Sequence, residues 1–206
     1  FVGYTDPEST SRVLAVIPVD SDGPDGATEV EIFLDRTPFY AESGGQVGDT
    51  GSITTETGTA VVLDTTYALP NLRRHTARIT EGTIEAGQQA EARIDVERRD
   101  AIRRNHTGTH LLHWALRNVL GDHVKQAGSW VGPDRLRFDF SHYEAVTRDQ
   151  ITEIERLVND QTLRNERVRA FETSMNEAEA MGAVAFFGDK YGDIVRVLEA
   201  GPSIEL

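Results

Sequence analysis

The pattern of the chain changes at residues 95–120, which read DVERRDAIRRNHTGTHLLHWALRNVL. Apolar side chains recur there at the spacing of an α-helix, at Ile102, Leu112, Leu116, Val119 and Leu120. Asp95 is a suitable N-cap, and Gly121 follows at a position where helices commonly end. The sequence therefore predicts a long helix that separates two regions of different pattern.

The residues before this helix predict a small β-barrel or β-sandwich. Short, β-branched and partly alternating segments are separated there by turns rich in glycine and aspartate. These segments are residues 12–19, 28–34, 51–54, 59–65, 74–79 and 89–94. Such a series of short strands is typical of a barrel or sandwich. We therefore expect residues 1–94 to form a β-barrel-like domain.

The residues that follow predict an α+β domain over 95–206. A strand pair is expected at 128–131 and 134–140, and the capping box Thr147–Gln150 begins a second helix. That helix carries one apolar stripe, formed by Ile151, Ile154, Leu157 and Val158. A strand at 167–171, a short helix at 176–181 and a strand at 193–198 are expected next. The expected fold class is α+β, with helices packed against a sheet.

Composition excludes several classes of function. The formal net charge of −13 disfavours loose binding to DNA or other polyanions, although a local basic patch stays compatible with it. No apolar run approaches the roughly 18 residues that a membrane span needs. The absence of cysteine excludes thiolate ligands within these residues. We expect a cytoplasmic protein with no membrane partner.

His106 and His110 lie four residues apart within the expected helix. Residues at this spacing share one helix face, with Cβ atoms about 5–6 Å apart. Two such imidazoles can bind one metal ion, each at about 2.0–2.1 Å. His113 lies one turn further on and could complete a three-histidine site, whereas Thr107 replaces the glutamate of a metalloprotease motif. Ordinary polar side chains on a half-buried helix are the alternative interpretation.

Three further groups of residues are candidates for binding. Residues 39–51 contain Gly44, Gly45 and Gln46, which form either a ligand loop or a glycine-rich β-turn. Gln126 lies just after the long helix and could hold a polar substrate group. Four arginines near the helix start oppose its dipole, and they indicate either a bound anion or a solvated face: Arg98, Arg99, Arg103 and Arg104.

Five motifs in series resemble those of the editing domain of alanyl-tRNA synthetases, which also occurs in free-standing alanyl-tRNA editing proteins. They read FYAESGGQVGDTG at 39–51, NHTGTHLLH at 105–113, QAGS at 126–129, LRFDFSH at 136–142 and FGDKYGD at 187–193. The resemblance covers essentially the whole chain. The opening residues Phe1–Tyr4 favour a piece of the synthetase over a free-standing editor.

The resemblance implies a zinc ion bound by His106 and His110, with a cysteine and a histidine expected after Leu206 as the remaining ligands. The metal site would then be incomplete within these residues. The resemblance also implies an active-site glutamine at Gln126 and a pocket-lining Thr109. Gly44, Gly45 and Gln46 would border the amino acid or ribose, and phosphate contacts are expected from Arg103, Arg104 and Lys190.

The function implied by the resemblance is hydrolysis of Ser-tRNA(Ala) or Gly-tRNA(Ala), with the tRNA(Ala) acceptor end as partner. ATP and Mg²⁺ would serve only the aminoacylation domain, which these residues do not contain. Three alternatives stay open at this point. They are a free-standing editing hydrolase, a non-catalytic module that binds the tRNA acceptor end, and an unrelated metallohydrolase that uses His106, His110 and His113.

Overall fold

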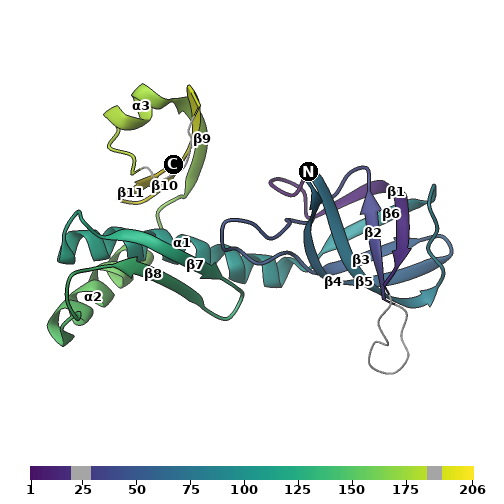
Figure 1. Ribbon diagram of the computed structural model, residues 1–206, viewed down its shortest axis with the longest axis horizontal. Coiled ribbons are helices and arrows are strands. Elements are labelled where there is room, and N and C mark those ends of the chain that lie inside the picture. Colours follow the sequence, from purple (N-terminus) through teal and green to yellow (C-terminus); the bar gives the residue numbers. More distant parts are fainter. Residues whose placement is uncertain (20–28, 185–191) are drawn as a thin grey trace. The chain divides into compact units, whose positions relative to one another are not determined.

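The computed structural model describes residues 1–19, 29–184 and 192–206, and Figure 1 shows the arrangement of their elements. The chain divides into two compact units, Phe1–Ile102 and Arg103–Leu206. Helix α1 (Val96–Leu120) begins in the first unit and ends in the second. Among the described residues, no helix is both long and apolar enough to cross a membrane.

The first unit contains a closed antiparallel barrel with the strand order β1-β2-β5-β4-β3-β6. Its strands are β1 (Glu8–Pro18), β2 (Glu29–Leu34), β3 (Gly51–Thr55), β4 (Gly58–Leu69), β5 (Leu72–Gly82) and β6 (Gln89–Ile94). The predicted β-barrel is therefore confirmed. Thr28, the first residue of the second expected strand, lies outside the described residues.

The core of the barrel is formed by strands in which buried and exposed side chains alternate. Strand β6 alternates strictly, so that Ala90, Ala92 and Ile94 are buried while the residues between them are exposed. The same inward face on the other strands carries Val13, Ile32, Ile53 and Val62. Because successive side chains of a strand point to opposite faces, one face of each strand fills the interior.

His75 is a polar residue within this apolar interior, and it is fully buried. Its Nδ1 lies 2.8 Å from the carbonyl oxygen of Ile32, which can only accept, so Nδ1 carries the hydrogen. Its Nε2 lies 2.9 Å from the Thr37 hydroxyl. Burial, reinforced by the charge of Arg73, lowers the pKa of His75 to about 4 against the backbone hydrogen bond that raises it. His75 is therefore neutral in the folded barrel at neutral pH.

We expect the barrel to lose about 3 kcal/mol of stability as the pH falls from 6.5 to 4. The unfolded chain binds a proton at His75 below about pH 6.5, whereas the folded barrel resists that proton until about pH 4. The stability is complete above this window and is lost within it. Urea unfolding followed by the NMR methyl signals of Ile32 and Ile53 measures it, because both tryptophans, Trp114 and Trp130, lie outside the barrel.

The control for this prediction is His75→Gln, which keeps hydrogen-bonding groups but cannot titrate. The difference in unfolding free energy between pH 6.5 and pH 4 should shrink in the variant. An equal difference in both proteins would show that other groups cause the pH dependence.

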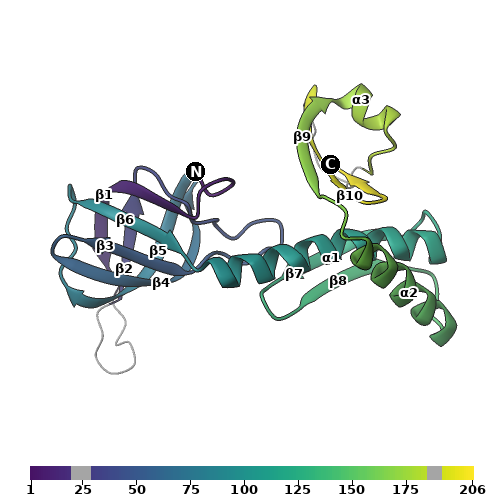
Figure 2. The same cartoon turned by 180° about the vertical axis from the view of Figure 1, so that it is seen from behind.

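The second unit holds the rest of α1 and several shorter elements, which Figure 2 shows from behind. They are β7 (Lys125–Val131), β8 (Leu136–Ser141), α2 (Arg148–Arg164), β9 (Arg169–Ser174), α3 (Met175–Ala180), β10 (Ile194–Ala200) and β11 (Ser203–Glu205). The α+β class is confirmed. The single sheet that was expected is wrong, because the described residues form a β7-β8 hairpin and a separate β11-β10-β9 sheet.

Two apolar clusters explain why the second unit has two sheets. One cluster joins α1 and α2 to the hairpin through Leu116, Ile154 and Phe138. The other packs α3 on the β9–β11 sheet through Ala178 and Val197. Each sheet therefore has its own helix cover and its own core.

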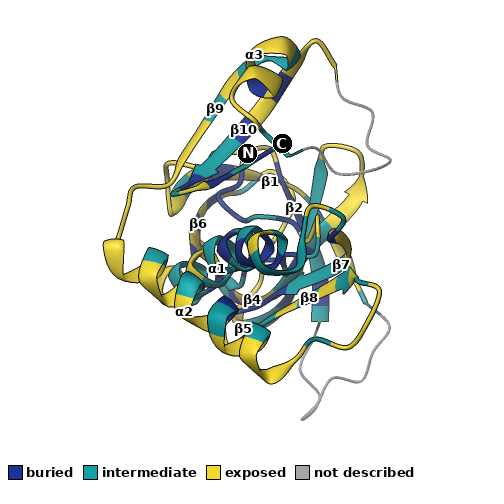
Figure 3. Cartoon of the chain, turned by 90° about the vertical axis from the view of Figure 1, so that its left-hand side faces the viewer, coloured by how far each residue is buried: buried dark blue, intermediate teal, exposed yellow. Residues whose placement is uncertain are grey.

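Both ends of α1 lie where the sequence predicts them. The Asp95 carboxylate accepts a hydrogen bond from the backbone N–H of Arg98 at 3.0 Å, which is N-cap geometry. Gly121 follows the last turn with φ +113°, a region that favours glycine. Figure 3 colours most of α1 as buried or intermediate, whereas most residues of α2 are exposed. Most of α1 is therefore at least partly shielded from solvent.

Helix α2 begins with the predicted capping box, in which Thr147 and Gln150 satisfy each other's backbone groups. Ile154 is buried, and Leu157 and Val158 pack on the same cluster. Ile151 is 44% exposed, so its place in the apolar stripe was wrong. The apolar cluster contacts the helix only from Ile154 onward.

Candidate functional site

His106 and His110 lie on one face of α1 with their rings stacked. The ring centroids are 5.1 Å apart and the ring planes differ by 15°. The His110 side chain is only 14% exposed, and His106 is half-buried. The two imidazoles therefore lie together, as the spacing of four residues predicts.

Glu205 on β11 contacts this helix face through both oxygens of its carboxylate. One oxygen accepts a hydrogen bond from Nδ1 of His110, and the other accepts from Nδ1 of His113 at 2.8 Å. The Ser203 hydroxyl donates to the second oxygen at 3.2 Å. A carboxylate can only accept, so both Nδ1 atoms carry the hydrogen. A residue near the end of the described chain thus orients two histidines of α1.

The charges of this cluster follow from burial and hydrogen bonding. Burial alone would raise the pKa of Glu205, but the hydrogen bonds from His110 and His113 outweigh it and lower the pKa to about 2. Burial, together with the nearby His110, lowers the pKa of His106 to about 4. At neutral pH the cluster therefore contains a carboxylate and a neutral His106 imidazole, which is the form that binds metals.

The histidine pair fits a metal ion in one specific respect. Within the described part of the chain, Nε2 of His110 is buried without a hydrogen-bond partner, while its Nδ1 is held by Glu205. Metal-binding histidines usually donate their other N–H to a carboxylate or carbonyl in this way. Within the described residues, however, no three His, Cys, Asp or Glu side chains are placed to hold a metal. The pair could therefore supply only part of a set of ligands, and the described residues do not support a three-histidine site that includes His113.

The two expected catalytic residues lie on different elements. Thr109 is buried on α1, and its hydroxyl donates to the Asn105 carbonyl at 2.9 Å. Gln126 is exposed on β7, directly opposite Phe140 on β8. Residues opposite each other in an antiparallel pair share a sheet face, and Phe140 packs in the cluster that includes α1. Gln126 therefore lies on the hairpin face that carries Phe140, and the roles of Gln126 and Thr109 stay predictions.

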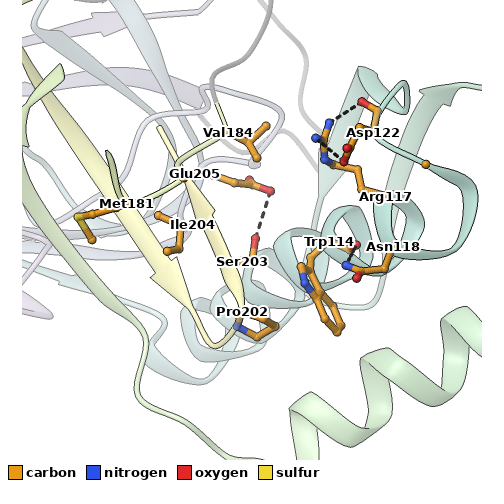
Figure 4. Close-up of a pocket in the computed structure, with 12 residues that line it drawn as sticks. Trp114, Arg117, Asn118, Asp122, Met181, Val184, Pro202, Ser203, Ile204 and Glu205 are labelled. Atoms are coloured by element: carbon orange, nitrogen blue, oxygen red, sulfur yellow. Dashed lines mark hydrogen bonds and ion pairs between the residues drawn. The ribbon is translucent and has the colours of Figure 1, made fainter. Parts of the chain in front are cut away.

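A cavity of about 480 Å³ lies beside Glu205 and is shown in Figure 4. Trp114, Arg117 and Asn118 of α1 line one side of it, and Ser203 and Glu205 of β11 line another. These α1 residues continue the face of His110 and His113 toward the end of the helix. The cavity therefore gives a small ligand room next to the carboxylate that orients the histidines.

The Gly-Gly-Gln segment forms a tight turn in the first unit. Ser43 and Gln46 exchange backbone hydrogen bonds of 3.2 and 3.0 Å, and the two residues between them have φ values of +59° and +83°. Two positive φ values define the hairpin turn that glycines favour. The turn alone therefore accounts for Gly44 and Gly45, and their binding role, with that of the buried Gln46, stays a prediction.

The arginines at the start of α1 divide into two kinds. Arg98 donates to the Gly48 carbonyl at 2.8 Å, and Arg99 binds the Asp49 carboxylate with Nε at 2.9 and 3.0 Å. The side chains of these two arginines therefore serve the fold. Arg103 and Arg104 are exposed, so their phosphate contacts stay predictions. Lys190 lies outside the described residues.

The sequence alone does not identify Glu205 as part of the histidine cluster. The signal was the alternation in Ser203-Ile-Glu205, where the polar residues on either side of Ile204 are buried on one face of β11. Three residues are too few for alternation to identify a strand without the pairing partner β10.

Comparisons with known proteins find relatives that match the whole chain. A sequence model of the family described as tRNA synthetases class II (A) matches residues 1–98. The alanine–tRNA ligase of Acetivibrio thermocellus is 53% identical over 100% of this chain and 24% of its own length. The corresponding ligases of Alkaliphilus oremlandii and Geobacillus thermodenitrificans are 50% and 48% identical over 98% and 100% of this chain. The chain spans about a quarter of the length of these relatives. Along its whole length, this chain is therefore homologous to a segment of alanine–tRNA ligases.

Proposed function

We propose that this chain is the proofreading region of an alanine–tRNA ligase. In this proposal it hydrolyses the ester that joins serine or glycine to the 3′ end of tRNA(Ala). The observation that carries the proposal is the stacked His106–His110 pair, with Nε2 of His110 buried and unbonded and Nδ1 held by Glu205. The relatives' shared name, alanine–tRNA ligase, supplies the substrate class.

The chemistry of alanine selection makes such a site necessary. A pocket for alanine can reject glycine only through one methyl group, which is worth about 1–3 kcal/mol. It rejects serine poorly as well, because an apolar pocket discriminates only about a hundredfold against an added hydroxyl. A second site that hydrolyses the wrong ester then supplies the missing accuracy. Such a site can select serine through a hydrogen bond to its hydroxyl.

The residues take the following parts in this proposal. His106 and His110 would hold a zinc ion, which would supply Lewis-acid polarisation of a water molecule or an anchor for the substrate. Gln126 reads the serine hydroxyl or orients the attacking water, and Thr109 limits the size of the pocket. The remaining contacts are to the amino acid or ribose from Gly44, Gly45 and Gln46, and to phosphates from Arg103, Arg104 and Lys190.

A module that binds the tRNA acceptor end without hydrolysing it is the second candidate. The observation in its favour is the partial set of metal ligands among the described residues. Deacylation of Ser-tRNA(Ala) distinguishes the two, measured with residues 1–206 and with a polypeptide continued past Leu206. Hydrolysis by either form supports proofreading. Binding of the tRNA by both forms without hydrolysis in either supports the module and contradicts our proposal.

Gln126→His should lower the rate of Ser-tRNA(Ala) deacylation by about a hundredfold or more, as expected for a group that positions the water or its proton. If Gln126 reads the hydroxyl, the loss should be larger for Ser-tRNA(Ala) than for Gly-tRNA(Ala). The matched control is Gln89→Ala, which removes an exposed glutamine from barrel strand β6. An unchanged rate in Gln126→His would remove Gln126 from the site.

A further inference from the structure

We propose that Glu205 is a positioning residue, which fixes the tautomer and ring orientation of His110 and His113 so that Nε2 of His110 is presented as a bare acceptor. The inference rests on the proposed function only for what Nε2 binds. The orientation itself follows from the described hydrogen bonds. Neither the family motifs nor the relatives' names assign any part to this carboxylate.

The first step of the argument is the division of the carboxylate between two rings. His110 and His113 lie three residues apart on α1, so their side chains project from the same face. Glu205 bonds one ring through each oxygen. A single carboxylate therefore sets both rings at once, and no rotation of one ring by 180° can keep the pattern.

The second step concerns the opposite nitrogen of His110. With the hydrogen held on Nδ1, a neutral imidazole has its lone pair on Nε2. This Nε2 is buried and has no hydrogen-bond partner among the described residues, and the ring is stacked against His106. An unsatisfied buried acceptor carries a desolvation penalty. A cation at Nε2 would remove that penalty.

The third step is the rigidity of Glu205 itself. Glu205 of β11 lies opposite Leu198 of β10, and it also forms a β-bridge with Val184. The Leu206 N–H donates to the Val184 carbonyl at 3.1 Å, and the Ser203 hydroxyl holds the carboxylate from its own strand. The backbone of Glu205 is thus held on both sides, and its carboxylate is held by Ser203. A preorganised site needs this kind of support.

The tautomers of His110 and His113 test the inference directly. Long-range ¹H–¹⁵N correlation NMR of the chain at pH 7 should show both residues with the hydrogen on Nδ1. Glu205→Gln should shift His110 or His113 toward the other tautomer, because an amide presents only one acceptor oxygen. An Nε2–H tautomer of His110 in the unaltered chain would overturn the inference, and this result needs no variant to fold.

Glu199→Gln is the matched control, because Glu199 is a carboxylate of the same sheet that pairs with Arg169. It should leave both tautomers unchanged. A Zn²⁺ titration followed by the same His110 signals should give a Kd about 10–100-fold higher for Glu205→Gln than for Glu199→Gln. Equal Kd values for the two variants would overturn the positioning role.

These measurements separate the inference from the proposed function. They use no tRNA, so a chain that fails to hydrolyse Ser-tRNA(Ala) can still show the predicted tautomers. Conversely, an active protein in which Glu205→Gln changes the tautomer of neither His110 nor His113 would keep the function and remove Glu205 from it.

Discussion

Asp49→Asn is expected to lower the free energy of unfolding of the barrel unit by about 3–5 kcal/mol. The side chains of Asp49 and Arg99 are 2% and 12% exposed, so their ion pair is shielded from water. Arg99 also donates to the carbonyls of Gly3 and Pro38, at 2.8 and 3.1 Å. Without the carboxylate, a buried guanidinium would lose its counter-charge while its other bonds keep it in place. That uncompensated charge is the reason for the large effect.

Asp49 also accepts two hydrogen bonds from the barrel unit, which add to this loss of stability. Its carboxylate accepts the backbone N–H of Tyr40 at 2.7 Å, and its backbone carbonyl accepts the Thr65 hydroxyl at 2.9 Å. The loop of residues 39–51 is therefore tied to strand β4 and to the first turns of α1 through one residue. An asparagine in that position can turn its NH₂ group toward another donor, which costs further stability.

Glu8→Gln is the matched control for Asp49→Asn. Glu8 pairs with Arg93 on the same barrel, but the side chains are 56% and 68% exposed. Exposed pairs of this kind contribute about 0–1 kcal/mol. Urea unfolding followed by the methyl signals of the barrel measures both variants. Similar small losses in the two would show that the Asp49–Arg99 pair is not a stabilising contact.

His110→Ala is expected to lower the rate of Ser-tRNA(Ala) deacylation by about a hundredfold or more. Loss of an outer partner of a metal ligand already costs about 10–100-fold, and His110 is proposed as a ligand itself. The variant also leaves Glu205 with one histidine fewer. The reduction should appear at saturating tRNA, because the lost contact concerns the reacting ester and not the body of the tRNA.

Glu97→Gln is the control on the same helix. Glu97 is exposed in the first turn of α1 and is not among the residues that line the cavity beside Glu205. The variant should keep the full rate, and far-UV circular dichroism should show equal helix content in both variants. If His110→Ala deacylated as fast as Glu97→Gln, the histidine pair would be structural and the proofreading assignment would lose its basis.

Local patterns predicted the elements of this fold well. Helix α1 starts within one residue of the expected position because Asp95, Ile102 and Leu116 carry the cap and the period in the sequence itself. Strand β1 begins four residues earlier than expected, at Glu8 instead of Arg12. Its first residues pair with β6, at Ser11–Ala90 for example, and this long-range pairing leaves little trace in the local pattern.

Long-range polar contacts were beyond the sequence. Arg99 finds its counter-charge in Asp49, 50 residues earlier. Glu205 joins His113 across 92 residues. Such pairs depend on how sheets and helices come together, and no local periodicity reports that. The spacing of His106 and His110 was informative because helix geometry alone brings the two side chains together.

The 95-residue separation between His110 and Glu205 has a consequence for biosynthesis. At ribosomal rates of about 5–20 residues per second, Glu205 is synthesised about 5–20 s after His110. Until β11 emerges from the ribosome, the imidazoles of His110 and His113 are free to rotate. Their final orientation is therefore acquired only after β11 has been synthesised and has docked.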